Sequence, residues 1–284
     1  MNSYLEVAIE AAREAGGILL AELDRPVQIA YKGDVDIITQ ADKRSELAIV
    51  SRLRTHFPKH AIVGEEGGAQ SATTAETSGS KFTWYVDPLD GTTNFAHGFP
   101  WFCVSIGLAV SAPGEGASGN AAAGKEELLA GVVYQPVTQE LFTAAKGEGA
   151  YRNNKRIHVS KIDKLATSLL GTGFPAHKRA QNPNIHYYWN FTLRSHGVRR
   201  AGSAALDLAS VACGRFEGFW EFGLNAWDTA AGVLLVREAG GTVTDFAGQP
   251  YQLGARELLA SNTTIHAEMQ ATATEVESAS GSRG

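Results

Sequence analysis

The chain contains only two cysteines, Cys103 and Cys213, among its 284 residues. They form neither a CxxC pair nor a cluster with zinc-ligand spacing, so the sequence supports neither a disulfide framework nor a structural zinc site. Both lie among apolar residues. This setting predicts buried, reduced thiols.

A strong charge of one sign is also absent. The formal net charge is -5 at pH 7, so no basic field is present to attract nucleic acid, and we expect no direct contact with it. A phosphorylated substrate would therefore need local positive charge from a metal ion or a few placed cations. With 44% hydrophobic and 9% aromatic residues, the chain can bury a sizeable core.

Long apolar runs are missing as well. No stretch approaches the roughly 20 apolar residues of a membrane span. The N-terminal segment carries Glu6, Glu10 and Arg13 among its apolar residues, unlike a secretory signal. We therefore expect a soluble cytoplasmic protein without membrane contacts.

Several catalytic motifs cannot be found. The chain has no P-loop, no GxSxG elbow, no HExxH helix and no cysteine followed by the arginine of a cysteine-based phosphatase loop. Residues 114–119 match GxGxxG by letter, but they lie in a Gly/Ala/Ser-rich segment, 111–126, that we expect to be a surface loop. A dinucleotide site is therefore not predicted.

Apolar spacing in the first half predicts a mixed α and β fold. A long helix runs through residues 5–23, and Pro26 ends it. A second helix begins near Asp42 and places Leu47 on its apolar side. Short segments rich in β-branched or aromatic residues predict strands at 61–63, 82–87, 101–110, 128–134 and 140–145.

The second half alternates strands and helices. Strands are expected at 168–172, 216–222, 242–246 and 257–260, and helices at 184–195, 203–213 and from 227 to the glycines at 240–241. We expect an α+β lobe over residues 1–158, an α/β lobe over 159–270 and a flexible polar tail over 271–284.

The strongest chemical signal is a carboxylate-rich segment at the end of a predicted strand. Pro88 and Gly91 force a turn there, which can aim Asp87, Asp90 and the Leu89 carbonyl at one point. Hard divalent cations prefer such oxygen ligands. On this segment alone, a turn that satisfies its own backbone is an equally good explanation.

Two further acidic elements favour the metal interpretation. Glu65 and Glu66 follow the predicted strand 61–63, and Asp228 lies in the first turn of an apolar helix. Taken alone, the glutamates would be solvated and the aspartate would offset the helix dipole. However, each acid lies at a strand end or a helix start, where ligands converge in layered α/β folds.

Four segments together resemble the inositol monophosphatase family, within the group of lithium-sensitive, metal-dependent sugar phosphatases, and bacterial members in particular. These segments are 64–66, 84–95, 200–207 and 227–232. The resemblance implies a layered αβαβα sandwich, a homodimer and lithium sensitivity. It also implies hydrolysis of phosphomonoesters with two or three Mg²⁺ per active site.

The resemblance further implies roles for individual residues. The metal ligands would be Glu65, Asp87, the Leu89 carbonyl, Asp90 and Asp228. Thr92, paired with Asp42, would orient and deprotonate the attacking water, with Glu65 also catalytic. The substrate contacts would be Gly91, Thr92, Gly202, Ser203, Ala204, Glu221 and Asp228. Lys32 aligns with a family lysine near the metals.

The residue chemistry agrees with these roles. Two metal ions roughly 3.5–4 Å apart can activate water and stabilise the leaving oxygen of a phosphate ester. Clustered carboxylates repel one another unless a cation offsets their charge. For Ser203, capping of its helix is at least as good an explanation as substrate contact.

The substrate is the open point. Relatives that share these motifs act on fructose 1,6-bisphosphate, 3′-phosphoadenosine 5′-phosphate or histidinol phosphate. The sequence TTNF at 92–95 is common in inositol monophosphatases, and Glu221 offers a hydroxyl acceptor that would repel a second phosphate. We therefore expect a small phosphorylated polyol, myo-inositol 1-phosphate, although Glu221 could also be a surface acid. A regulatory partner of RNA-polymerase complexes is the alternative from another class.

Overall fold

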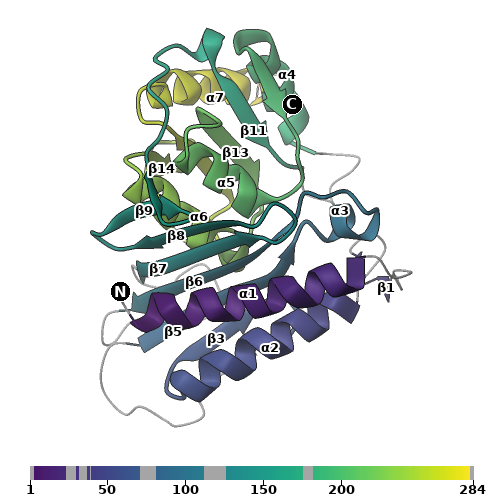
Figure 1. Cartoon of the computed structure of the whole chain (residues 1–284). Helices are drawn as coiled ribbons and strands as arrows, with labels where there is room; N and C mark the ends of the chain where they lie inside the picture. Colours follow the sequence, from purple (N-terminus) through teal and green to yellow (C-terminus); the bar gives the residue numbers. More distant parts are fainter. Residues whose placement is uncertain are drawn as a thin grey trace.

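Helices and sheets alternate in an αβαβα arrangement (Figure 1). A computed structural model describes residues 3–23, 30–31, 37–38, 40–70, 81–111, 126–174 and 182–281. Lys32 lies outside these residues, as do most of the expected loops, at 71–80 and 112–125.

The large sheet is built from the first half of the chain. It has eight strands in the order β10-β9-β8-β7-β6-β5-β3-β4. β3 and β5 are parallel, and the other neighbouring pairs are antiparallel. The strands are β3 (Ala61–Gly64), β4 (Gly68–Gln70), β5 (Lys81–Asp90), β6 (Cys103–Ser111), β7 (Glu126–Gln135), β8 (Glu140–Ala145), β9 (Gly149–Arg152) and β10 (Lys155–Ile157).

Two N-terminal helices, α1 (Ser3–Leu23) and α2 (Gln40–His56), cover one face of this sheet (Figure 1). The predicted apolar face of α1 is confirmed, since its buried residues recur at helical spacing. The expectation for α2 is wrong at Leu47, which is 71% exposed. The inward face of α2 instead includes polar residues, Asp42, Ser45 and Glu46.

The small sheet is built from the second half of the chain and has five strands in the order β12-β11-β13-β15-β14. β11 is parallel to β12 and β13, whereas β15 is antiparallel to β13 and β14. The strands are β11 (Leu169–Thr172), β12 (Gly197–Arg199), β13 (Gly218–Phe222), β14 (Thr242–Thr244) and β15 (Glu257–Ser261).

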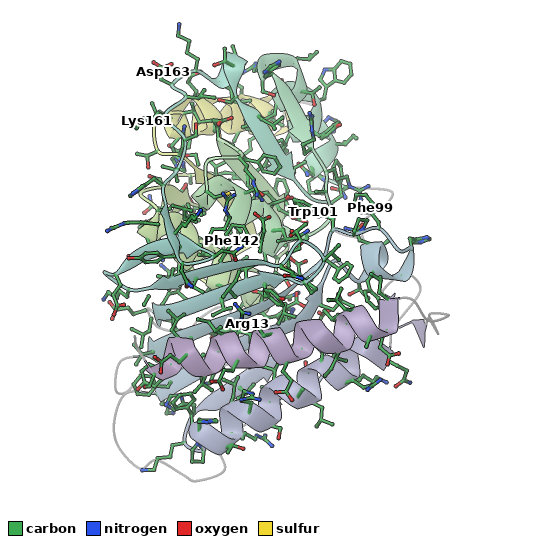
Figure 2. The ribbon with its side chains drawn as sticks, viewed as in Figure 1. Arg13, Phe99, Trp101, Phe142, Lys161 and Asp163 are labelled. Atoms are coloured by element: carbon green, nitrogen blue, oxygen red, sulfur yellow. The ribbon has the colours of Figure 1, made fainter. Side chains whose placement is uncertain are left out.

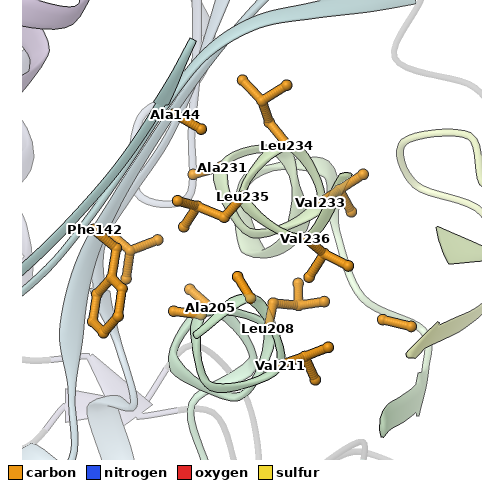
Figure 3. Packing of buried hydrophobic residues seen from close by; sticks show 14 of the residues in the cluster. Phe142, Ala144, Ala205, Leu208, Val211, Ala231, Val233, Leu234, Leu235 and Val236 are labelled. Atoms are coloured by element: carbon orange, nitrogen blue, oxygen red, sulfur yellow. The ribbon is translucent and has the colours of Figure 1, made fainter. Parts of the chain in front are cut away.

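The helices α5 (Ala204–Ala212) and α6 (Ala226–Glu238) form the middle layer between the sheets. Figure 3 shows their apolar side chains packed together and against Phe142 and Ala144 of β8. Both sheets therefore contribute to one hydrophobic core. The division into lobes at residue 158 stays a prediction.

Small residues allow α6 to lie close to the large sheet. A Cβ on Gly107 of β6 would be 2.6 Å from the Cβ of Ala230, and one on Gly131 of β7 would be 2.9 Å from the carbonyl oxygen of Ala231. Side chains at these two positions would push the helix away. The close approach holds the N-terminal half of α6 against the middle of β6 and β7.

The outer layer consists of α4 (Asn184–Arg194) and α7 (His266–Gly281), which lie on the far side of the small sheet (Figure 1). The expected flexible tail is wrong for residues 271–281, which continue α7. Met269, Ala273 and Val276 are buried in a core cluster. Their spacing places them on one helical face. The polar composition of the segment hides this narrow apolar stripe in the sequence.

The remaining described elements are short. They are the antiparallel pair β1 (Ala30–Tyr31) and β2 (Ile37–Ile38), the helix α3 (Thr92–Ala96) and a 3-10 turn, η1 (Leu165–Thr167). Among the described residues, no helix has both the length and the apolar character needed to cross a membrane.

Adjacent glycines in α1 offer a direct test of the packing. A Cβ on Gly16 would be 2.6 Å from the Tyr134 ring, whereas a Cβ on Gly17 would meet nothing within 4 Å. Gly17→Ala should raise the free energy of unfolding by about 0.5–1 kcal/mol, because alanine favours the helix. Gly16→Ala should lower it by about 1–3 kcal/mol through overpacking. Urea unfolding checks both, and equal effects of the two substitutions would contradict this packing.

Candidate active site

The end of β5 contains a bulge between Asp87 and Asp90. Asp87 pairs with Ser105 and Asp90 pairs with Cys103, so β5 has one more residue than β6 over this stretch. Bulges of this kind change the direction in which side chains point. The expected sharp turn is therefore a bulge, and the chain turns only at Gly91, whose φ is 99°.

The Asp87 carboxylate is held by this local geometry. Its Oδ1 accepts a hydrogen bond of 2.9 Å from the backbone N–H of Leu89, and only 2% of the residue is exposed. The Asp87 carboxylate therefore does satisfy the backbone of its own segment, which is the alternative that the sequence left open. This bond engages one carboxylate oxygen and leaves the other available to a ligand.

Asp90 connects β5 to the N-terminus of α5. Its Oδ2 accepts hydrogen bonds of 2.7 Å from the Ser203 hydroxyl and 2.7 Å from the Ala205 N–H. The Ser203 oxygen also accepts from the Leu206 N–H at 3.3 Å, so the expected helix cap is confirmed. Because the positive end of the α5 dipole faces Asp90, the helix stabilises the charged carboxylate.

Cys103 lies directly behind Asp90. Its Sγ is 3.9 Å from the same Oδ2 atom and 3.6 Å from the Ser203 hydroxyl. The thiol is buried and free, as expected. Cys213 is also free but only partly buried.

Asp228 is the third residue of α6, and its position follows from the packing of that helix. The Ser105 hydroxyl donates to the Trp227 carbonyl at 3.3 Å, which ties the first turn of α6 to β6. Oδ2 of Asp228 accepts from the Asn225 N–H at 2.7 Å. Asp228 thus stabilises its own helix start and still retains a second oxygen for a ligand.

The structure brings these acids close enough to repel one another. Burial, followed by repulsion from Glu65, Asp90 and Asp228, raises the pKa of Asp87 well above its usual value. Burial and repulsion from Asp90 raise the pKa of Asp228 to about 8. The pKa of Asp90 is also raised by burial, although its hydrogen bonds to Ser203 and Ala205 oppose the shift.

Glu65 reaches the cluster from the turn after β3. Its backbone N–H donates to the Val86 carbonyl at 3.2 Å, which extends the parallel pairing of β3 with β5 beyond the last paired residues. This bond places Glu65 alongside Asp87, whose pKa it raises by repulsion. The structure therefore brings together these two acids, which the sequence singled out separately.

The donor set fits a hard divalent cation. The four acids supply only oxygen, the donor type that Mg²⁺ and Ca²⁺ prefer, and a cation would offset the repulsion that raises their pKa values. Over the described ranges, no three His, Cys, Asp or Glu side chains are already spaced to hold a metal ion. Binding of a cation would therefore require the carboxylates to move closer together.

Thr92 and Asp42 form the pair that the sequence led us to expect. Thr92 opens α3, and its hydroxyl lies 3.3 Å from Oδ1 of Asp42 and 3.0 Å from the Leu89 carbonyl. Asp42 is fully buried in the first turn of α2. The pair borders the β5 bulge.

Of the expected substrate residues, Glu221 lies on the small sheet, Gly202, Ser203 and Ala204 lie at the start of α5, and Gly91, Thr92 and Asp228 lie at the β5 end and on α6. Glu221 of β13 is partly buried, and its pKa is raised well above the usual value by burial and by Asp228 and Asp90, although Arg200 opposes the shift. A Cβ on Gly173 would be only 2.1 Å from its carboxylate. The Glu221 carboxylate therefore packs against Gly173 and lies close enough to Asp228 and Asp90 to be affected by their charge, so it is not an isolated surface acid.

Gly202 and Ala204 flank Ser203 at the start of α5. Gly202 has φ of 86° and lies next to Asn94, a residue of α3 to which the sequence assigned no role. The Asn94 amide donates to the carbonyls of Trp101 at 2.7 Å and Ala201 at 2.9 Å. It thereby ties the loop around Phe99 and Trp101 (Figure 2) to the start of α5.

Asp207 is another residue that the sequence did not single out. It is 1% exposed, and Oδ1 has no hydrogen-bond partner among the described residues. Burial, then repulsion from Glu221 and Asp90, raises its pKa well above the usual value. Only its helical position on α5 could have indicated that it faces the site.

Comparison with known proteins agrees with the geometry. The model of the inositol monophosphatase family matches residues 1–279. The chain belongs to this family. Membership confirms the resemblance and the layered fold, and it supports a metal-dependent phosphatase that acts on a small phosphorylated substrate.

Individual relatives are named either as Nus factors or as inositol monophosphatases. The chain is 43% identical over 269 residues to the Nus factor SuhB of Pseudomonas aeruginosa, with 93% of each chain covered. It is 41% identical over 272 residues to an inositol-1-monophosphatase of Synechocystis, covering 95% of this chain and 88% of that protein. The inositol monophosphatase structure from Anabaena has a TM-score of 0.81 at 40% identity and 96% coverage of both chains.

The raised pKa of Asp228 predicts a pH dependence of stability without metal. Its pKa is about 8 in the folded state against an ordinary value of 3.8, so between these pH values the folded state holds a proton that the unfolded chain has lost. The resulting stabilisation is complete below the unfolded pKa and is lost as the pH rises through about 8. In chelator, the contribution of Asp228 to the free energy of unfolding should fall between about pH 5 and 8, by up to about 1 kcal/mol per pH unit, and then level off.

Asp228→Asn should remove this part of the slope in urea unfolding at pH 5–9. The matched control is Asp163→Asn, because Asp163 lies exposed at the outer edge of the molecule (Figure 2). The control should follow the native protein. A slope in Asp228→Asn as steep as that of the native protein would contradict the prediction.

Proposed function

We propose that this protein is an Mg²⁺-dependent phosphatase whose preferred substrate is myo-inositol 1-phosphate. The observation that carries the proposal is the convergence of Glu65, Asp87, Asp90 and Asp228, from three separate segments, on one place where they repel one another. We assign these acids and the Leu89 carbonyl as ligands of two or three Mg²⁺.

Bound Mg²⁺ would supply the positive charge that offsets the phosphate and lowers the pKa of water. The chain's own residues would orient the water and take its proton. We assign this task to Thr92 and Asp42, with Glu65 beside them. A threonine hydroxyl is a weak base, so the buried Asp42 carboxylate, 3.3 Å away, is the group that can accept the proton.

Glu221 and the start of α5 would recognise the polyol. Glu221 would accept a substrate hydroxyl, with Asp228 nearby. The Ser203 hydroxyl already donates to Asp90, so we assign the substrate contacts of Gly202, Ser203 and Ala204 to their backbone. A second phosphate next to Glu221 would meet like charge, which favours a monophosphate.

A substrate panel tests this assignment. With Mg²⁺, kcat/KM should be highest for inositol 1-phosphate and lower for fructose 1,6-bisphosphate, 3′-phosphoadenosine 5′-phosphate and histidinol phosphate. Chelator should abolish phosphate release, and lithium should inhibit it. Higher turnover of a bisphosphate would overturn the substrate assignment, and activity in chelator would overturn the metal requirement.

A second role as a regulatory partner of RNA-polymerase complexes is favoured by one observation, the 43% identity to a protein named Nus factor SuhB. Asp87→Asn separates the two roles. It should lower kcat/KM more than about 100-fold, because loss of a metal ligand should exceed the 10- to 100-fold effect of outer residues. Cells that carry only this variant should lose the phosphatase-dependent phenotype. Normal behaviour of those cells would instead favour the regulatory role.

A homodimer stays a prediction, which sedimentation at micromolar concentration tests. The outer face of α4 carries an exposed apolar stripe that would suit a dimer interface. Ile185, Trp189 and Leu193 are 53%, 65% and 67% exposed and lie four residues apart on one helical face.

A further inference from the structure

A second buried carboxylate of α2, that of Glu46, points toward the site. Glu46 follows Asp42 by one helical turn, so both residues lie on the same face of the helix. Glu46 is only 5% exposed. A buried carboxylate is unfavourable unless it is hydrogen-bonded, so its partners indicate what it does.

The partner of Glu46 is the backbone of the turn that carries Glu65. Oε2 accepts a hydrogen bond of 2.8 Å from the Glu66 N–H. A Cβ on Gly64 would be 2.6 Å from the same Oε2 and 2.9 Å from Cδ. The carboxylate therefore packs against the residue before Glu65 and binds the residue after it.

The acids that act most strongly on Asp87 are Glu65, Asp90 and Asp228. Glu46 instead binds a backbone N–H, and its carboxylate fills the space beside Gly64. Its effect on the site is therefore indirect, through the turn that carries Glu65. α2 thus contacts two parts of the site, Thr92 through Asp42 and the Glu65 turn through Glu46.

We propose that Glu46 is a positioning residue that holds the turn 64–66 so that Glu65 faces Asp87, and thereby sets the affinity of the site for its divalent cation. The inference rests on the proposed function, because Glu65 is assigned there as a ligand. Glu46 itself would touch neither substrate nor metal.

Three substitutions test the proposal in the full-length protein, with Mg²⁺ binding measured by calorimetry. Glu46→Ala removes the acceptor and should weaken binding about 10- to 100-fold, as loss of outer support does at other metal sites. Glu46→Gln keeps an oxygen that can accept from the Glu66 N–H and should retain most of the affinity. Gly64→Ala should weaken binding, because its Cβ displaces the carboxylate.

The double variant Gly64→Ala with Glu46→Ala should be no weaker than the single variants, since both substitutions break the same contact. Glu238 provides a matched control, because its carboxylate, like that of Glu46, accepts hydrogen bonds from the backbone. Its donors are the N–H groups of Gly147 and Gly149, each at 2.8 Å. Glu238→Ala disturbs a hairpin turn outside the acidic cluster and should leave Mg²⁺ affinity unchanged.

Kinetics distinguish positioning from other roles. At saturating Mg²⁺, Glu46→Ala should recover most of kcat with KM for substrate unchanged, while the Mg²⁺ concentration for half-maximal rate rises 10- to 100-fold. Native Mg²⁺ affinity in a folded Glu46→Ala would overturn the proposal. Equal losses in Glu46→Gln and Glu46→Ala would also overturn it, because the charge would then act as a ligand.

Where Glu46→Ala does not fold, Glu46→Gln and Gly64→Ala decide the question: native affinity in Gly64→Ala, or a large loss in Glu46→Gln, overturns the proposal. Failure of the proposed function has a different signature. In that case the native protein releases no phosphate from any ester in the panel, while Mg²⁺ binding still responds to Glu46.

Discussion

Repulsion among buried carboxylates is the constraint on which the rest of the site depends. Glu65, Asp87, Asp90 and Asp228 come from three segments and raise one another's proton affinity. The fold opposes this repulsion with hydrogen bonds to one oxygen each of Asp87, Asp90 and Asp228. The remaining oxygens are left for a hard cation, which would relieve the repulsion more fully than protons do.

The layered architecture delivers these acids to one place. The end of β5 supplies two of them at a bulge, and the turn after the parallel strand β3 supplies the third. Glycines in β6 and β7 allow α6 to approach the sheet closely enough for Asp228 to join them. The N-terminus of α5 holds Asp90 from the opposite layer, so the site lies where both sheets and the middle helices meet.

Chemistry and specificity are carried by different parts of the fold. The acids, Thr92 and Asp42 belong to the large sheet and to helices packed on it, including α6 with Asp228. In the proposed function, recognition of the polyol rests on Glu221 of the small sheet, whose carboxylate lies against Gly173. Relatives can therefore keep the same acids and change substrate by altering the small-sheet side, in line with the general separation of scaffold and site.

The sequence by itself determined the family and the order of most helices and strands, and it singled out the acids that the structure brings together, because these depend on residue type and local spacing. It did not reveal that Leu47 points outward and Glu46 inward, that residues 271–281 form a packed helix, or that Asp207 is buried beside Glu221. Those features depend on which distant segments pack against each residue. Only the tertiary structure decides such contacts, since local periodicity does not encode them.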